Sequence, residues 1–275
     1  MHARDKPLPI LRATTRRERL ERARHIADWI LGHYSDAVVA IGIYGSTARG
    51  SDEPYSDLEM SVLMRSSPTP GRDERYVQGL KISVEFHTVG SVYRRLQRVD
   101  LTWPLCVDQF VSVLSLYDPE GHWPKLKLLV DQLPSGSFVQ AIREGIVGEL
   151  LENFAKLENA RKRDDAPAMR WIAWNLAWDV AMISALMNRA YFTSWSRTPD
   201  EILRLPSLLP AVKSLVEKFR NGDLRSAKGL HRCCEAAVRG VVQHVATLGV
   251  HVQVEPSLAG PPREQIGGGG PGSKR

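Results

Sequence analysis

Residues 37–64 read AVVAIGIYGSTARGSDEPYSDLEMSVLM, and this stretch decides the fold. Its first part, residues 37–44, is short, apolar and rich in β-branched side chains, and it stops at Gly45 and Ser46. This pattern predicts a buried strand that leads into a tight turn. Residues 57–64 alternate polar and apolar side chains, which predicts a second strand after a short polar link.

Two acids open the second predicted strand. Asp57 and Glu59 are two residues apart, so both carboxylates project from the same face of a strand. Adjacent carboxylates repel each other unless a cation lies between them, and Mg²⁺ favours such oxygen ligands. Glu85 lies on the polar face of a third predicted strand, residues 80–87, and we expect it to complete the metal site or to bind the substrate. The alternative is that the D-x-E pair is only a solvated polar face.

The turn between the two strands carries groups that suit an anion. Gly45 leaves the backbone accessible, and the Ser46 hydroxyl and the Arg49 guanidinium can donate hydrogen bonds to phosphate oxygens. Because this turn lies close to Asp57 in sequence, we expect one compact unit to hold both a triphosphate and a metal ion.

The rest of the chain predicts an α+β protein. A capped helix is expected after Thr14 and Thr15, beside a small mixed sheet. From about residue 136 the pattern becomes helical. We expect an N-terminal α/β domain with the predicted triphosphate and metal site over residues 1–135, a C-terminal helical bundle over 136–256 and a disordered Gly- and Pro-rich tail over 257–275. The helices of the bundle are expected at residues 138–166, 168–191, 200–205, 209–219 and 223–248.

Composition restricts the class of protein. The 275 residues are 43% hydrophobic, which is sufficient for a buried core. No apolar run is long enough for a membrane span or a signal peptide, so we expect a cytoplasmic protein. Three cysteines in no zinc-like spacing argue against disulfides and structural metal. The net charge of +6 favours anionic ligands, but the arginines concentrate in residues 12–24 without interleaved aromatics, so we expect no nucleic-acid partner.

Three segments carry a family resemblance. The turn and acid pair, GSTARGSDEPYSDLEM, resemble the DNA polymerase β-like nucleotidyltransferase superfamily. The longer runs are similar to the kanamycin nucleotidyltransferase family, the aminoglycoside 4′-O-nucleotidyltransferases, and the likeness is collinear across most of residues 18–165. These runs are AIGIYGSTARGSDEPYSDLEM at 40–60, WPLCVDQFVSVLSLYD at 103–118 and FVQAIREGIVGELLENFAKLENAR at 138–161.

The resemblance implies roles for particular residues. Asp57 and Glu59 correspond to catalytic metal ligands, Glu152 to the catalytic base and Lys156 to a phosphate-binding lysine. The nucleotide contacts would be Gly45, Ser46, Arg49, Ser56 and Lys156. Glu152 and Lys156 are four residues apart and share one helix face, although the same spacing is also that of an ordinary i,i+4 ion pair.

The acceptor of this family is a polycation, so its site needs carboxylates. We expect the substrate-binding residues to be Glu59, Glu74, Glu85, Asp100, Gln109 and Glu149, with Asp108 as a further candidate. Two positions depart from the family pattern: Ser83 stands where a glutamate is usual, and Thr102 where an aspartate is usual. The range of substrates is therefore open at this point.

The resemblance implies an enzyme that transfers AMP from ATP to the 4′-hydroxyl of kanamycin-, tobramycin- or amikacin-type aminoglycosides, releases pyrophosphate and confers antibiotic resistance. It implies two Mg²⁺ ions and a homodimer with active sites near the interface. Trp171, Trp174 and Trp178 recur at helical spacing and are expected in the core or at that interface. The alternatives are a nucleotidyltransferase for another hydroxyl, a protein or tRNA, or a toxin–antitoxin module.

Overall fold

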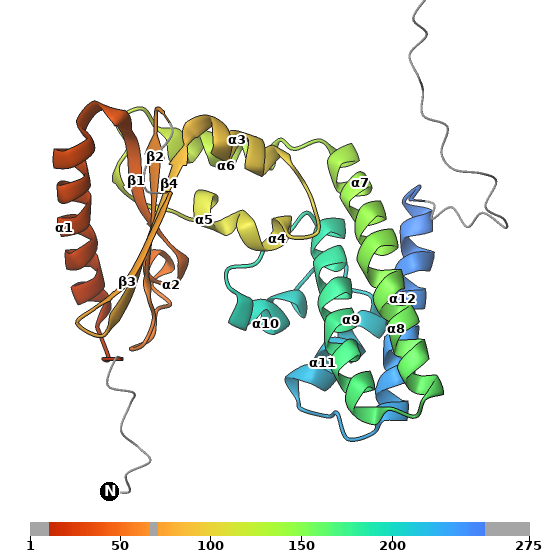
Figure 1. The fold of residues 1–275 in the computed structure, drawn as a ribbon. Helices are drawn as coiled ribbons and strands as arrows, with labels where there is room; N and C mark the ends of the chain where they lie inside the picture. Colours follow the sequence, from red (N-terminus) through yellow and green to blue (C-terminus); the bar gives the residue numbers. More distant parts are fainter. Residues whose placement is uncertain (1–10, 67–70, 251–275) are drawn as a thin grey trace, which may run out of the picture.

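The computed structural model describes residues 11–66 and 71–250 of the chain (Figure 1). The predicted tail at 257–275 lies outside these residues. The first helix, α1 (Arg16–Tyr34), begins where the sequence predicts it. Thr15 Oγ1 accepts a hydrogen bond from the backbone N–H of Glu18, and the Glu18 carboxylate accepts one from the backbone N–H of Thr15 at 2.7 Å. This reciprocal capping box fixes the start of the helix.

A five-stranded mixed sheet forms the N-terminal part, with strand order β3-β4-β2-β1-β5. Strands β2 and β4 are parallel, and every other neighbouring pair is antiparallel. The strands are β1 (Val38–Tyr44), β2 (Leu58–Met64), β3 (Arg72–Val77), β4 (Leu80–Thr88) and β5 (Leu114–Tyr117). The sequence predicted β1, β2 and β4 and missed the two edge strands.

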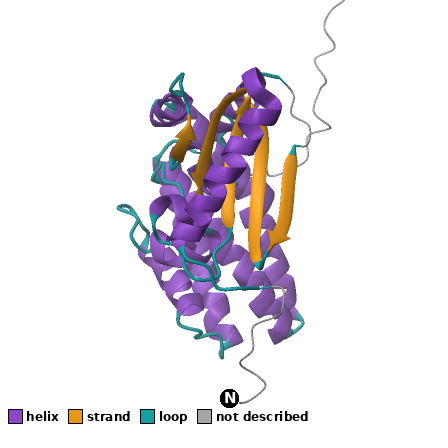
Figure 2. Cartoon of the chain, turned by 90° about the vertical axis from the view of Figure 1, so that its left-hand side faces the viewer, coloured by secondary structure: helices purple, strands orange, loops and turns teal. Residues whose placement is uncertain are grey.

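Strand β1 lies in the sheet interior, and all seven of its residues are buried. This explains its unbroken apolar run, since a strand covered on both faces has no polar alternation. One face of the sheet packs on α1, which Figure 2 shows lying across the strands. The other face is covered by helices between the sheet and the bundle, and its core continues into the bundle. They are α3 (Val89–Gln97), α4 (Trp103–Cys106), α5 (Asp108–Val111) and α6 (His122–Asp131).

The C-terminal part is a helical bundle, as predicted. The expected helix at 138–166 is not continuous, because residues 146–150 form a π-helical turn between two α-helices. The elements are α7 (Ser135–Gly145), η3 (Ile146–Leu150), α8 (Leu151–Lys162), α9 (Ala166–Met187), α10 (Thr198–Ile202), α11 (Pro210–Arg220) and α12 (Ala227–Thr247).

The architecture confirms the α+β prediction of a mixed sheet with helices followed by a helical bundle. The domain boundaries stay a prediction. Among the described helices, none combines the length and the apolar character that a membrane span requires.

Candidate active site

The acid pair lies at the start of β2. Asp57 is the last residue before the strand and Glu59 is its second residue, paired across the ladder with Tyr44 of β1. The strand thus begins one residue later than predicted. Burial raises the pKa of Glu59 to about 7, and the charge of Asp57 adds to this effect. A half-buried carboxylate whose charged form is disfavoured by burial and by a neighbouring acid suits a bound cation.

Position 45 requires a glycine, because of its backbone conformation and because the Glu59 carboxylate lies close to it. Its φ of +71° lies in the left-handed region, where a side chain is strained. A Cβ atom at Gly45 would also lie 2.0 Å from Glu59 Oε2. Gly45 begins the short helix α2 (Gly45–Arg49), so the missing side chain lets this helix approach the acid pair.

A polar cavity of about 240 Å³ lies over the acid pair. Most of the predicted nucleotide-binding residues line this cavity. Its opposite wall consists of residues 193–197, which the sequence did not predict. Its lining residues are Gly45, Ser46, Arg49, Ser51, Glu53, Ser56, Asp57, Glu59, Thr193, Ser194, Ser196 and Arg197. Gly45, Ser46, Arg49 and Ser56 therefore share one cavity with Asp57 and Glu59, as expected, and their roles stay predictions.

Arg19 of α1 holds the loop that leads to Asp57. Its side chain is almost fully buried, and its Nε donates to Asp52 Oδ2 at 3.0 Å. The same guanidinium donates to the carbonyl oxygens of Thr14 at 3.2 Å and Ser56 at 3.4 Å. A buried cation thus ties the residue before Asp57 to the first helix.

Arg49 connects the cavity to later parts of the chain. Its Nη1 pairs with the buried carboxylate of Asp108, and its Nη2 donates to the Thr193 carbonyl at 2.9 Å. Asp108, a candidate for substrate binding, is therefore engaged by an arginine. The charge of Arg49 is largely balanced before any ligand binds.

Glu85 lies one pleat further along the sheet than Glu59. In the parallel β2–β4 pair, Ser83 stands opposite Glu59, and Glu85 stands opposite Ser61. Glu85 contacts His87 at 3.4 Å and Arg72 at 3.5 Å, and the bond to His87 is the main cause that lowers its pKa. Within residues 11–66 and 71–250, no three His, Cys, Asp or Glu side chains are close enough to hold a metal ion together. Metal binding by Glu85 remains a prediction.

The other predicted acceptor ligands lie outside this cavity. Glu74 pairs with Arg72 at 2.9 Å and with Lys81 at 3.2 Å. Asp100 accepts hydrogen bonds from the backbone and hydroxyl of Thr102 at 3.0 and 2.7 Å. Gln109 lines a separate cavity of about 330 Å³ between β4 and the helices α3 to α5.

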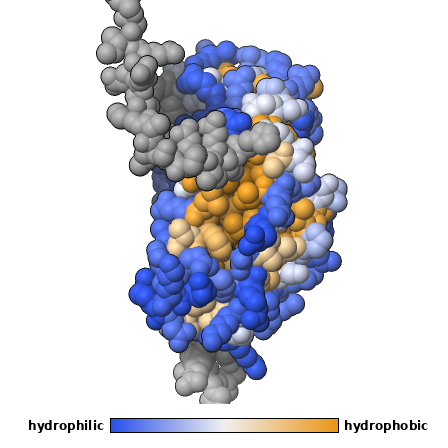
Figure 3. All heavy atoms as spheres, turned by 90° about the vertical axis from the view of Figure 1, so that its right-hand side faces the viewer, coloured by the Kyte–Doolittle hydropathy of each residue, from blue (hydrophilic) through white to orange (hydrophobic). Residues whose placement is uncertain are grey.

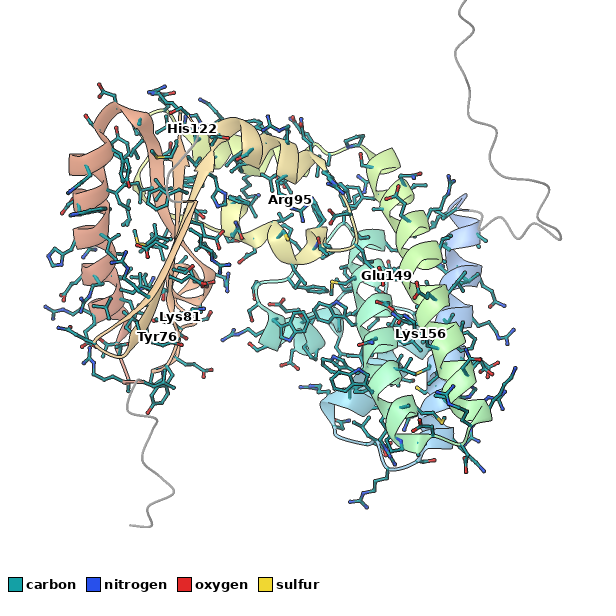
Figure 4. All side chains as sticks on the ribbon, in the orientation of Figure 1. Tyr76, Lys81, Arg95, His122, Glu149 and Lys156 are labelled. Carbon is teal, nitrogen blue, oxygen red and sulfur yellow. The ribbon has the colours of Figure 1, made fainter. Side chains whose placement is uncertain are left out.

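Glu152 and Lys156 form the i,i+4 ion pair that their spacing allows, with Nζ and Oε1 2.7 Å apart and both side chains more than half exposed. Glu149 lies one turn earlier, in η3. None of the three lines the cavity at Asp57. Figure 4 shows Glu149 and Lys156 on the bundle, apart from Lys81 on the sheet. The role of Glu152 as the catalytic base stays a prediction.

Comparison with known proteins finds a family model that matches the C-terminal part of the chain. Residues 120–251 match the model of the KNTase C-terminal domain. Two proteins called aminoglycoside nucleotidyltransferase (4′), from Staphylococcus aureus and a Bacillus species, are each 29% identical to this chain over 240 residues, which cover 87% of this chain and 95% of theirs.

One solved structure, of a nucleotidyltransferase-like protein from Exiguobacterium sibiricum 255-15, aligns with this chain at 16% identity and a TM-score of 0.47, over 83% of this chain and 75% of that one. The family model covers the helical bundle, and the alignments with the two relatives also include the acid pair. The similarity to the kanamycin nucleotidyltransferase family is thus supported by the family model over residues 120–251 and by two relatives along most of the chain.

Proposed function

We propose that this protein is an aminoglycoside 4′-O-nucleotidyltransferase that transfers AMP from ATP to the drug, releases pyrophosphate and thereby confers resistance. The observation that carries the proposal is the cavity in which Asp57 and Glu59 face Ser46, Arg49 and Ser56. An acid pair beside hydroxyl and guanidinium donors suits a metal-bound triphosphate. The names of the two relatives support the acceptor and its 4′ position.

The donor set of the acid pair fits Mg²⁺. Asp57 and Glu59 offer carboxylate oxygens from one side of β2, and the raised pKa of Glu59 reflects a charge that a cation would stabilise. When bound there, Mg²⁺ would lower the free energy of charge developing on the transferring phosphoryl group. We propose that two Mg²⁺ ions bind at this site and that Glu85 is a further ligand.

Other residues of the chain would bind the nucleotide and accept the proton of the acceptor. Ser46 and Ser56 would donate hydrogen bonds to phosphate oxygens, while Arg49, fixed by Asp108, orients the nucleotide. A general base must accept the proton of the attacking 4′-hydroxyl, and Glu152 has that role in the proposal. Lys156 would contact the phosphate beside it.

The position of Glu152 supports a composite site, that is, an active site formed by residues of two copies of the chain. Because Glu152 and Lys156 do not line the cavity of their own chain, we place them at the cavity of a second copy in a homodimer. Figure 3 shows apolar residues gathered on the side of the bundle turned away from the sheet, the kind of surface that a partner covers. Trp171 is 74% exposed, so it lies outside the core of one chain, and we place it at this interface.

Acceptor binding would use carboxylates around this composite site. Glu59, Glu74, Glu85, Asp100, Gln109 and Glu149 remain the proposed contacts for the ammonium and hydroxyl groups of the drug. Residues 1–135 would act as the nucleotidyltransferase domain and residues 136–256 as the helical domain of a cytoplasmic enzyme.

Pyrophosphate release tests this function directly. The purified protein is incubated with ATP, Mg²⁺ and either kanamycin or tobramycin, which carry a 4′-hydroxyl, or dibekacin, which lacks it. Release with the first two drugs and none with dibekacin supports the 4′ reaction. Equal release with dibekacin would move the reaction to another hydroxyl, and no release with any drug would exclude an aminoglycoside acceptor. Asp57→Asn should abolish release while the unfolding temperature stays unchanged.

A further inference from the structure

Arg197 joins the far wall of the cavity to the loop after α2. It lies in the segment between α9 and α10, and its Nη2 donates to the backbone carbonyl of Ser51 at 3.1 Å. The same segment is held a second time, because Arg49 donates to the Thr193 carbonyl at 2.9 Å. Two arginines therefore fix this wall against the loop that carries the predicted phosphate contacts.

The two arginines of the cavity differ in charge balance. Arg49 is paired with the buried carboxylate of Asp108. Arg197 is exposed, and among the residues that the structure describes no carboxylate oxygen lies within 4.0 Å of its guanidinium. Three carboxylates line the same cavity, those of Glu53, Asp57 and Glu59, yet none pairs with it. Arg197 thus retains an uncompensated positive charge at the cavity wall.

Ser51 provides a second, independent sign of a ligand. Its Oγ is buried, lies in a residue that lines the cavity, and has no hydrogen-bond partner in the described part of the chain. A buried hydroxyl without a partner is unfavourable, and in the wall of a polar cavity a bound ligand can supply that partner. Arg197 donates to the backbone carbonyl of Ser51, and both residues line the same cavity, so the hydroxyl and the guanidinium belong to neighbouring parts of its wall.

We propose that Arg197 and Ser51 form the subsite for the terminal phosphates of the nucleotide, the group that leaves as pyrophosphate. This inference rests on the proposed function. In the reaction, the acceptor oxygen forms a bond to the α-phosphorus while the bond from that phosphorus to the bridging oxygen breaks. The electron pair of the broken bond goes to the pyrophosphate, and the proton of the acceptor goes to the base. Arg197 stabilises the negative charge that accumulates on the leaving group.

Calorimetric titration with pyrophosphate and with AMP, each in the presence of Mg²⁺, tests the subsite on the full chain. Arg197→Gln should weaken pyrophosphate binding by about 10- to 100-fold, the range of a lost charge-assisted hydrogen bond. AMP lacks the terminal phosphates, so its affinity should change by less than about twofold. Arg197→Lys should bind pyrophosphate with intermediate affinity, and Ser51→Ala should weaken pyrophosphate but not AMP.

Arg204→Gln is the matched control, because Arg204 is an exposed arginine just after α10 that does not line the cavity. Unchanged pyrophosphate affinity in Arg197→Gln, an equal loss for AMP and pyrophosphate, or a wild type that binds no pyrophosphate would each overturn the subsite. The drug assay separates this inference from the proposed function. If the subsite behaves as expected but no aminoglycoside is modified, only the acceptor is wrong. If the drug is modified while Arg197→Gln binds pyrophosphate normally, only the subsite is wrong.

Discussion

The carboxylate of Glu59 lies against the Cα of Gly45, and a single added methyl group at Gly45 would come within 2.0 Å of Glu59 Oε2. The end of β1, the start of α2 and the acid pair are thus in contact at one point. This contact couples the conformation of the turn to the position of the proposed metal ligand.

Gly45→Ala should therefore impair both folding and transfer. The positive φ of Gly45 alone costs an alanine about 1–2 kcal/mol. Displacement of the Glu59 carboxylate should lower the transfer rate by about 100-fold, as expected when a reacting group is misplaced by about 1 Å. Urea unfolding and the pyrophosphate assay measure the two effects. Gly136→Ala serves as the control, because Gly136 lies in α7 with open space around it. Normal transfer by Gly45→Ala would contradict the coupling.

The Arg19–Asp52 pair gives a prediction about stability. Both side chains are about 2% exposed, so Arg19→Met removes the buried cation of Asp52 and leaves this carboxylate only the part-exposed Arg16, whose Nε lies 3.7 Å from Oδ1. Breaking a buried pair from one side costs about 3–5 kcal/mol. The double variant Arg19→Met with Asp52→Asn should recover a large part of this loss, since no buried charge remains. A chemical denaturation series checks the cycle. If the double variant were less stable than Arg19→Met, the buried charge would not be the cause.

The central strands could be predicted from sequence, and the edge strands could not. Strand β1 is an apolar run because it is buried, whereas β3 reads RDERYV and is mostly exposed at the edge of the sheet. Charged side chains protect an edge strand from pairing with other chains, but they also remove the alternation that identifies a strand. The pairing of β3 with β4 shows only in three dimensions.

The candidate site divides in the same way. Gly45, Ser46, Arg49, Ser56 and the acid pair were predicted because one strand–loop–strand unit carries them all. The opposite wall, residues 193–197, has no recognisable motif and is positioned by the hydrogen bond from Arg49 to the Thr193 carbonyl. The place of Glu152 relative to Asp57 could not be derived either, because helical spacing defines a face but not what that face contacts.

Asp179 of α9 predicts a dependence of stability on pH. Burial raises the pKa of Asp179 from 3.8 to about 6, and the hydrogen bond from Asn153 Nδ2 at 2.7 Å opposes this only in part. The folded protein therefore binds more protons than the unfolded chain between these pH values, so this group makes stability fall as pH rises from about 4 to about 6. Above pH 6 the ionised carboxylate should cost about 1–3 kcal/mol.

Asp179→Asn removes the titrating group and keeps an oxygen for Asn153. The variant should be more stable than the wild type at pH 7 and equally stable below pH 4. Urea unfolding at both pH values measures the difference. Asp164→Asn is a suitable control because Asp164 is exposed. A wild type and an Asp179→Asn variant with parallel pH profiles would show that the carboxylate ionises without cost.

The composite site makes the most specific prediction. If Asp57 of one copy works with Glu152 of the other, Asp57→Asn and Glu152→Gln should each be inactive alone. When the two variants are mixed and their subunits exchange, they form heterodimers in which one site has both mutations and the other has neither. Half of the dimers are then heterodimers with one intact site, so about a quarter of the wild-type activity returns.

The double variant carrying both changes, mixed with the wild type, is the control for subunit exchange. Its heterodimers contain one Asp57 and one Glu152, both from the wild-type copy, and these two residues belong to different sites. They should therefore be inactive, and the mixture should retain only the activity of the remaining wild-type dimers. Exchange is verified by native mass spectrometry of the mixture. If the Asp57→Asn and Glu152→Gln pair exchanges subunits and regains no activity, Glu152 does not act across the interface, and the base must come from the same chain or from another residue.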